Sequence, residues 1–236
     1  MIRLELSVDT LEGAVAADRL GVDRIELCSA AALGGLTPGP GLLAAVLDRT
    51  TAQVHMLVRP RDGDFRYAPE EVETLVKDVA HAVSAGAAGV VVGALTATGD
   101  LDLPVLAELV AAAGGRSSVT LHRAIDVCRD PLAAVENVAE LGINRVLSSG
   151  QAVRAEDGIA VLAGMVRVAA GRVAVMACGG VRAANAGAIV RATGVRDLHA
   201  APRTQLPSRG TSVVDFGAIV AFDAAQASAL VAAVRA

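Results

Sequence analysis

The stretch LGVDRIELCS (residues 20–29) carries the pattern on which the fold prediction rests. Its glycine, Gly21, ends a segment with helical spacing and is followed by an apolar residue and a strand-like run. The same order of helix, glycine and strand returns around Gly86, Gly142 and Gly194. Glycine suits these positions because the residue that follows a helix often takes a left-handed conformation. The chain therefore contains a weak internal repeat, in which each unit would supply a quarter of a barrel.

Strand-like and helix-like segments alternate along the 236 residues. The strand candidates are 2–7, 22–27, 53–58, 88–93, 117–121, 144–148, 172–176 and 195–199. The helix candidates are 10–20, 39–49, 69–85, 102–114, 131–141, 155–170, 183–193 and 223–235. Eight alternating pairs are the number that a closed parallel barrel requires, whereas a doubly wound sheet seldom needs so many evenly spaced units. The sequence predicts an α/β fold, a (β/α)8 TIM barrel in a single domain over residues 1–236.

The segment 200–222 interrupts the alternation. It is longer than the connections that usually join a strand to the next helix. We therefore expect an irregular excursion that covers one rim of the barrel or forms a contact surface.

Composition and charge argue against several classes of protein. The 21 basic and 25 acidic residues give a net charge of −4, which is not the basic balance that a nucleic-acid partner requires. Charged residues or histidine interrupt every apolar run before it reaches the length of a membrane span. The first 20 residues lack the pattern of a secretion signal, and three widely separated cysteines fit a reducing compartment. We expect a cytoplasmic protein without a nucleic-acid or membrane partner.

Polar residues gather where the predicted strands end, which is where barrels of this type hold their sites. An ordinary barrel core would place Val, Ile and Leu there. We therefore predict a site for a small anionic molecule. Its candidate catalytic residues are Glu26, His122, Asp126 and His199, with Glu26 or His122 as the general acid or base. Its candidate ligand-binding residues are Glu5, His55, Arg59, Arg123 and Arg203, with Arg59 and Arg123 as the clamp for the anion.

Several of these residues also have a structural interpretation. Glu5 and Glu26 could be carboxylates of the barrel interior that pair with Arg59 or Arg123 and tie strands together. Asp126 could cap the turn that follows it. Two further residues are expected to be uninvolved: His81 at the surface of a helix, and the inert Cys128.

Gly179 and Gly180 follow the seventh predicted strand, in the run Cys178-Gly-Gly-Val. Glycines at this point expose backbone N–H groups beside the positive end of the next helix, an arrangement that suits a phosphate or a carboxylate. Barrel enzymes often bind phosphate near the loops after strands seven and eight. A tight turn would need the same glycine pair, so the pattern by itself leaves both interpretations open.

The chain resembles the CutC family, whose members are described as copper homeostasis proteins. The resemblance lies in RIELC, GGLTP, RPRDGDF and HRAID, and it runs from about residue 3 to residue 203. The segments that resemble the family are 17–38, 54–67, 120–131, 145–150, 176–185 and 195–203. The resemblance implies a cytoplasmic barrel, usually a homo-oligomer such as a dimer or tetramer, that is associated with copper tolerance or Cu(I) binding.

The interpretation as a copper-binding protein depends on the cysteines. Proposed copper ligands in the family include a cysteine in the first strand and the cysteine of IELC, and these positions hold Ser7 and Cys28 here. Cys178 departs from the family pattern and could restore a two-thiolate site with Cys28. Together with Met176, these thiols would form a soft ligand set for Cu(I). Cys28 could instead act as a nucleophile if a base lies within reach.

Two functions follow. The first is copper homeostasis through Cu(I) binding, with Cys28 and Cys178 as the metal ligands. The alternative is a barrel enzyme, an isomerase, lyase or hydrolase, that acts on a small anionic metabolite, with phosphorylated metabolites among the candidates. No organic cofactor is expected in either case.

Overall fold

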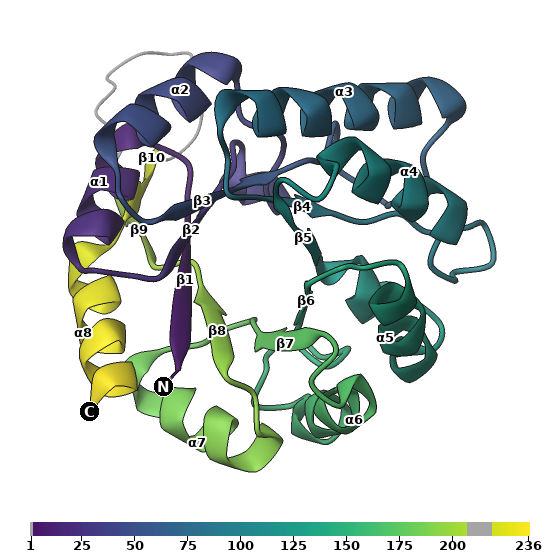
Figure 1. Cartoon of the computed structure of the whole chain (residues 1–236). Coiled ribbons are helices and arrows are strands. Elements are labelled where there is room, and N and C mark those ends of the chain that lie inside the picture. Colours follow the sequence, from purple (N-terminus) through teal and green to yellow (C-terminus); the bar gives the residue numbers. More distant parts are fainter. Residues whose placement is uncertain (1, 207–218) are drawn as a thin grey trace, which may run out of the picture.

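A computed structural model describes residues 2–206 and 219–236 of the chain. Eight parallel strands close into a barrel in chain order, with β8 returning to pair with β1 (Figure 1). The barrel strands are β1 (Arg3–Val8), β2 (Arg24–Leu27), β3 (Gln53–Leu57), β4 (Gly89–Val92), β5 (Ser118–Leu121), β6 (Arg145–Ser148), β7 (Ala174–Ala177) and β8 (Asp197–Ala200). This closed barrel confirms the fold predicted from the sequence.

Helices surround the barrel and follow its strands in turn (Figure 1). They are α1 (Leu11–Arg19), α2 (Pro40–Arg49), α3 (Pro69–Ala85), α4 (Leu103–Ala113), α5 (Pro131–Glu140), α6 (Ile159–Ala169), α7 (Ala183–Thr193) and α8 (Ala224–Arg235). Two short 3₁₀ helices, η1 (Ala31–Leu33) and η2 (Arg123–Val127), lie in the loops after β2 and β5. None of the helices in the described ranges combines the length and the apolar character needed to cross a bilayer.

Local chemistry explains where these helices begin and end. The side chains of Thr10, Asp102 and Asp130 accept backbone N–H groups at the first turns of α1, α4 and α5. The four repeat glycines have φ values of +68°, +96°, +80° and +78°, the left-handed region in which glycine is favoured: Gly21, Gly86, Gly142 and Gly194. The helix–glycine–strand repeat is thus confirmed.

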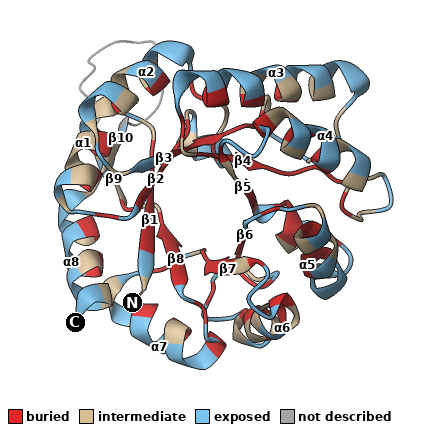
Figure 2. Cartoon of the chain, viewed as in Figure 1, coloured by how far each residue is buried: buried red, intermediate tan, exposed pale blue. Residues whose placement is uncertain are grey.

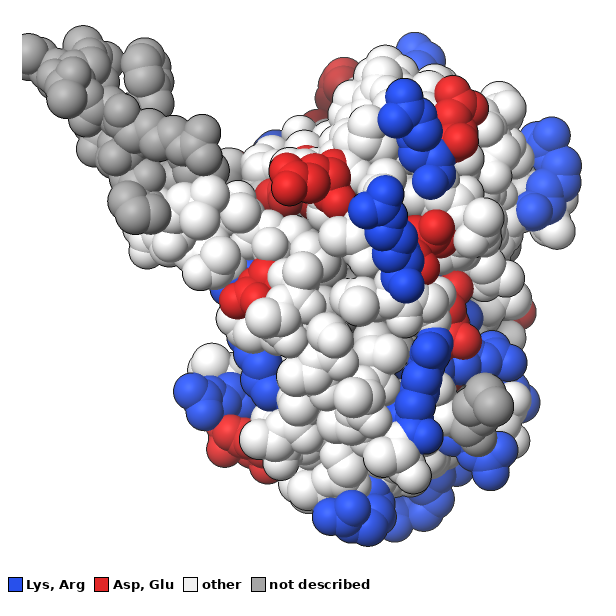
Figure 3. All heavy atoms as spheres, turned by 90° about the vertical axis from the view of Figure 1, so that its left-hand side faces the viewer, with Lys and Arg blue, Asp and Glu red and all other residues white. Residues whose placement is uncertain are grey.

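The core lies between the barrel and the inner faces of the helices. Apart from the first residue of some of them, the barrel strands are buried, while the outward faces of the helices are exposed (Figure 2). Over α1 and α8, basic and acidic side chains are interspersed among uncharged ones (Figure 3). Packing of apolar helix faces against the barrel therefore positions the strand ends that carry the site.

The structure corrects two expectations about segment boundaries. Within 200–222, β9 (Arg203–Leu206) and β10 (Ile219–Phe222) form an antiparallel pair, so these parts are regular, not irregular. The rest of that predicted excursion, residues 207–218, lies outside the described residues. Helix α6 begins at Ile159 instead of residue 155, because the N–H of Ala155 donates to the carbonyl of Gly179 and ties the preceding segment to the loop after β7.

Side chains fill the barrel in layers contributed by alternate strands, as the strand registers require. One layer comes from the even strands, and the layer above it comes from the odd strands. Their members are Arg24, Gly89, Arg145 and Asp197 below, and Glu5, His55, Thr120 and Met176 above. A charged interior of this kind departs from the Val, Ile and Leu layers usual in such barrels.

Gly89 makes room for the His55 ring in this interior. A Cβ atom at residue 89 would lie 2.6 Å from Cε1 of His55. We expect Gly89→Ala to lower the free energy of unfolding by about 1–3 kcal/mol, the usual cost of overpacking a core. Gly41→Ala in α2 is the matched control, because a Cβ there meets nothing within 4 Å. Urea unfolding of both variants checks this, and equal stabilities would contradict it.

Candidate functional site

A pocket of about 500 Å³ opens at the C-terminal end of the barrel. The structure brings most of the predicted site residues to its wall. These are Glu26, Cys28, Arg59, His122, Arg123, Asp126, Cys178, Gly179, Gly180, His199 and Arg203. Glu5 and His55 are not among its lining residues, because both lie deeper in the barrel.

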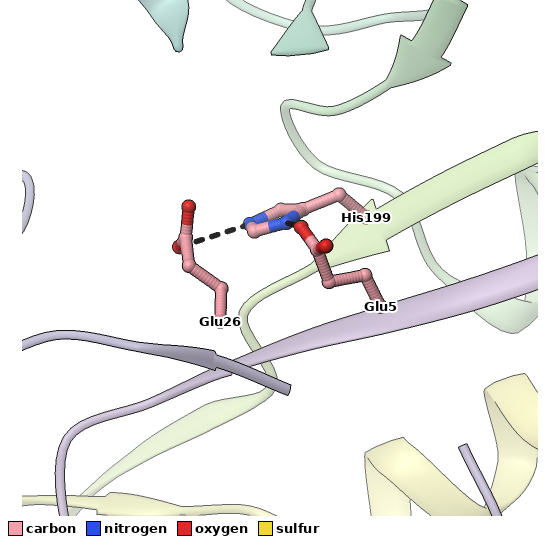
Figure 4. Close-up of side chains that lie close together, drawn as sticks. All are labelled: Glu5, Glu26 and His199. Carbon is pink, nitrogen blue, oxygen red and sulfur yellow. Dashed lines mark hydrogen bonds and ion pairs between the residues drawn. The ribbon is translucent and has the colours of Figure 1, made fainter. Parts of the chain in front are cut away.

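His199 lies between two buried carboxylates at the floor of this pocket (Figure 4). Barrel closure pairs β8 with β1 and sets His199 opposite Glu5, whose Oε1 is 2.8 Å from Nδ1. The other ring nitrogen, Nε2, is 3.7 Å from Oε2 of Glu26 on β2. Of the two carboxylates, only that of Glu26 lines the pocket. The imidazole therefore connects an enclosed carboxylate to one that a ligand can reach.

The surroundings set the protonation of these three groups. Burial would raise the pKa of Glu5, but the hydrogen bond and charge of His199, with the charge of Arg24, hold it below its usual range. Burial would lower the pKa of His199, but the charge of Glu26 and the hydrogen bond to Glu5 raise it above 6.5. Burial raises the pKa of Glu26 against the opposing charge of His199. Glu5 is thus ionised, and the pKa values of both His199 and Glu26 are raised above their ordinary values.

A buried ion-pair network supports Glu5 from below, and sequence reasoning missed it. Nε of Arg24 donates to Oε2 of Glu5 at 3.0 Å, and Nη2 donates to Asp197 at 2.5 Å. Arg145 also pairs with Asp197, at 3.4 Å. The available signal was positional, because Arg24, Arg145 and Asp197 each stand three residues after a repeat glycine, at the first position of a buried strand. The expected pairing of Glu5 with Arg59 or Arg123 is therefore wrong.

Arg59 is buried and fixed by the backbone. Its Nη1 donates to the carbonyls of Leu33 and Gly35, at 2.9 and 3.0 Å, and its Nη2 donates to the carbonyl of Gly63 at 2.9 Å. It thereby holds the loops after β2 and β3 together. The guanidinium also lies 5.1 Å from the centroid of the Phe65 ring.

Arg123 and Asp126 organise the loop after β6. Arg123 Nε donates to Asp126 Oδ2 at 2.7 Å, and its Nη2 donates to Ser149 Oγ at 2.8 Å. Asp126 Oδ1 also accepts from the hydroxyl of Ser148 and from the backbone N–H of Ser149. Among the described residues, Asp126 thus contacts Arg123 and the loop after β6 and not the turn that follows it, so the capping interpretation is wrong. Its carboxylate is held by these contacts, although its side chain lines the pocket.

His122 and His55 are neutral imidazoles. Burial and the charge of Arg59 lower the pKa of His122 to about 3, and burial lowers the pKa of His55 to about 4. Nδ1 of His122 accepts the backbone N–H of Ala124 at 3.1 Å, so its proton must lie on Nε2. His122 is therefore a hydrogen-bond donor and is poorly suited to the role of general base.

The glycine pair after β7 is a second polar feature of the pocket wall. Gly179 and Gly180 have φ values of +89° and +69°, so both need glycine. Within residues 2–206 and 219–236, neither of their N–H groups donates a hydrogen bond. They lie beside Arg182 and the start of α7, and the positive end of a helix favours an anion.

Both predicted metal-binding thiols line the pocket but pack in different apolar clusters. Cys28 packs with Leu57 and Val91, and Cys178 packs with Leu147 and Met176. Burial and the charge of Glu26 raise the pKa of Cys28 to about 11, and burial also raises the pKa of Cys178. The two thiols are thus protonated at neutral pH, and a shared Cu(I) site remains a prediction.

Glu5, Glu26 and His199 form a candidate metal-binding group among the described residues. Their ligand atoms lie within 4.8 Å of one another. Carboxylate oxygens and an imidazole suit a harder divalent cation more than Cu(I). If the cation took the place of the proton on Nε2 of His199, Glu5 would hold the other ring nitrogen and only His199 and Glu26 would be ligands.

Sequence comparisons relate the chain to one family. A family model described as the CutC family matches residues 2–204. A CutC family protein from Aliivibrio fischeri is 43% identical over 215 residues, which are 91% of this chain and 87% of the relative. Another, from Bacteroides thetaiotaomicron, is 44% identical over 207 residues, 87% of this chain and 83% of that protein.

Structural comparisons agree with this. A crystal structure of a CutC protein from Streptococcus agalactiae, named for copper homeostasis, has a TM-score of 0.80 at 29% sequence identity. It covers 84% of this chain and 98% of its own. N-(5'-phosphoribosyl)anthranilate isomerase from Pyrococcus furiosus has a TM-score of 0.60 at 11% identity, covering 100% of this chain and 99% of that one, and shares the fold alone.

Proposed function

This chain belongs to the CutC family, and from that premise we propose that it binds a small anionic molecule in the pocket and exchanges a proton with it. The observation that carries the proposal is the position of His199, between the enclosed Glu5 and the accessible Glu26, at the floor of the pocket. A buried pair with shifted pKa values, as Glu26 and His199 are, is typical of general acid–base catalysis.

The charge of the pocket wall favours an anion over a cation. Among the described lining residues, four arginines face two carboxylates, and one of those carboxylates, Asp126, is paired with Arg123. Arg203 and Arg182 have partly or fully exposed side chains, so they can turn toward a ligand. The N–H groups of Gly179 and Gly180, which have no partner within residues 2–206 and 219–236, add donors on the same wall. A phosphate or phosphonate group fits this wall.

In the proposed reaction, Glu26 and His199 act as one acid–base unit. One of them accepts a proton from the bound molecule and the other returns a proton to it, and transfer of one proton between Glu26 and His199 then restores the starting protonation state. Glu5 does not touch the ligand and holds the ring through Nδ1. Isomerisation, aldol cleavage and hydrolysis all use such a unit.

Calorimetric titration with ethylphosphonate tests the anion pocket. We expect binding by the wild type and a tenfold or greater loss of affinity in Arg182→Leu or Arg203→Leu, because a hydrogen bond to a charged group contributes about 1.5–3 kcal/mol. Arg172→Leu is the matched control, since this exposed arginine precedes β7 at the opposite end of the barrel. Absence of binding, or equal loss in the control, would argue against the proposal.

Cu(I) binding is a second candidate function. It is supported by the presence of Cys28 and Cys178 in one pocket and by the copper homeostasis name of the Streptococcus agalactiae relative. Bound Cu(I) would replace the thiol protons. The positive charge of Arg203, whose Nη2 lies 3.8 Å from Cys28 Sγ, would repel the metal ion. A Cu(I) competition titration under reducing conditions decides this. Stoichiometric binding that Cys28→Ser abolishes would support it.

A further inference from the structure

Two buried N–H groups in the pocket wall lack a hydrogen-bond partner among the described residues. They are Nε of Arg59 and Nε2 of His122, whose side chains belong to residues only 7% and 5% exposed. Buried donors are nearly always paired in native structures, so each such exception requires an explanation. Both residues line the pocket, so a molecule bound there is a candidate partner for the two donors.

The two donors belong to one cluster around Phe65. The guanidinium carbon of Arg59 lies 5.1 Å from the Phe65 ring centroid, and the centroid of the His122 ring lies 4.7 Å from it. Because both groups contact the same ring, Arg59 and His122 are neighbours in the pocket wall. The proximity also explains why the charge of Arg59 lowers the pKa of His122.

Neither donor can turn away from this position. Three backbone carbonyls hold the terminal nitrogens of Arg59, and the Ala124 N–H holds Nδ1 of His122. The His122 ring also packs against the bare backbone of Gly93, where a Cβ would lie 2.3 Å from Cε1. Donors fixed in advance of binding stabilise negative charge on oxygen most effectively, because no reorganisation accompanies the binding.

We propose that Arg59 Nε–H and His122 Nε2–H form an oxyanion site for a carboxylate or enolate oxygen of the bound molecule. This inference rests on the proposed anion pocket and narrows its ligand. The substrate class becomes a small molecule with a phosphate-like group at the Gly179–Gly180 wall and a carbonyl or carboxylate oxygen at Arg59 and His122. A neutral imidazole in this role donates a hydrogen bond to the developing charge without giving up its proton.

Matched pairs of probes separate this site from the rest of the pocket. Phosphonocarboxylates with one, two or three methylene groups are compared by calorimetry with alkylphosphonates in which a methyl group replaces the carboxylate. For the length that fits best, we expect the wild type to prefer the carboxylate by about tenfold or more, since its oxygen accepts charge-assisted hydrogen bonds.

Variants of His122 test whether its N–H causes the preference for the carboxylate probe. His122→Phe keeps a ring but removes the donor. We expect this variant to bind the phosphonocarboxylate and the matched alkylphosphonate with equal affinity. His122→Gln, whose amide can replace the Nε2 donor, should restore part of the preference. His81→Phe on the exposed surface of α3 is the control and should change nothing. Thermal unfolding of each variant verifies that the fold is retained.

The outcomes distinguish this inference from the proposed function. Equal affinities of the two probe types for the wild type, with alkylphosphonates still bound, would overturn the oxyanion site and leave the anion pocket. If alkylphosphonates do not bind, the proposed function fails, and titration with acetate alone decides the oxyanion site. A shift of the His122 Nε2–H resonance with acetate in ¹⁵N-labelled wild type supports the site, and no shift overturns it.

Discussion

Arg24→Met lowers the free energy of unfolding by about 3–5 kcal/mol, the usual cost of breaking a buried ion pair by removing one partner. Arg24 is 1% exposed and pairs with both Glu5 and Asp197. Its removal leaves the charge of Glu5 less well compensated and leaves Asp197 with Arg145 as its remaining partner. Urea-induced unfolding at pH 7, followed by circular dichroism, measures the loss.

Two further variants make this result specific. Arg49→Met, at the exposed end of α2, removes the same charge from the surface and is expected to change stability by less than about 0.5 kcal/mol. Arg24→Met combined with Glu5→Gln and Asp197→Asn should recover part of the loss, because the uncompensated charges are gone. A loss below about 1 kcal/mol in Arg24→Met would show that the network is not structural.

The network also predicts a dependence on pH. In the folded protein the pKa of Glu5 lies below its ordinary value of 4.5. The stability that ionised Glu5 contributes is therefore present above pH 4.5 and is lost as the pH falls through the folded pKa. Arg24 is one cause of the low pKa, so Arg24→Met should unfold at a higher pH than the wild type during acid titration.

Glu26→Gln lowers the pKa of His199 and removes the acid–base unit from the pocket. The charge of Glu26 is the largest influence that raises this pKa above 6.5. A raised histidine pKa contributes stability that is present below pH 6.5 and is lost as the pH rises through the folded pKa. The variant should therefore lose this contribution, and its His199 should release the imidazolium proton at a lower pH than in the wild type.

Histidine ¹⁵N resonances measure this directly. In the wild type, His199 should titrate above pH 6.5, whereas His55 and His122 stay neutral down to about pH 4 and about pH 3. Glu156→Gln is the control, because that exposed carboxylate pairs with Arg154 away from His199. An unchanged His199 titration in Glu26→Gln would mean that the two groups do not share a proton, and the proposed catalytic role would fall with it.

The sequence by itself determined the barrel. Each repeat glycine, helix cap and apolar strand is decided by neighbours only a few residues away, so local conformational preferences and burial patterns predict them. The positions of Glu26 and His199 near strand ends also follow from the sequence, because each lies in a predicted strand and all strands of a parallel barrel end at one face.

Tertiary structure alone decided which of the polar residues touch. Glu5 and His199 stand 194 residues apart and meet only because β8 closes on β1. The partner of Glu5 is Arg24 because the parallel register of β1 and β2 sets them side by side, while backbone carbonyls occupy Arg59. Charge pairing depends on distances of a few ångströms, and those distances arise from barrel closure and register, which no local pattern contains.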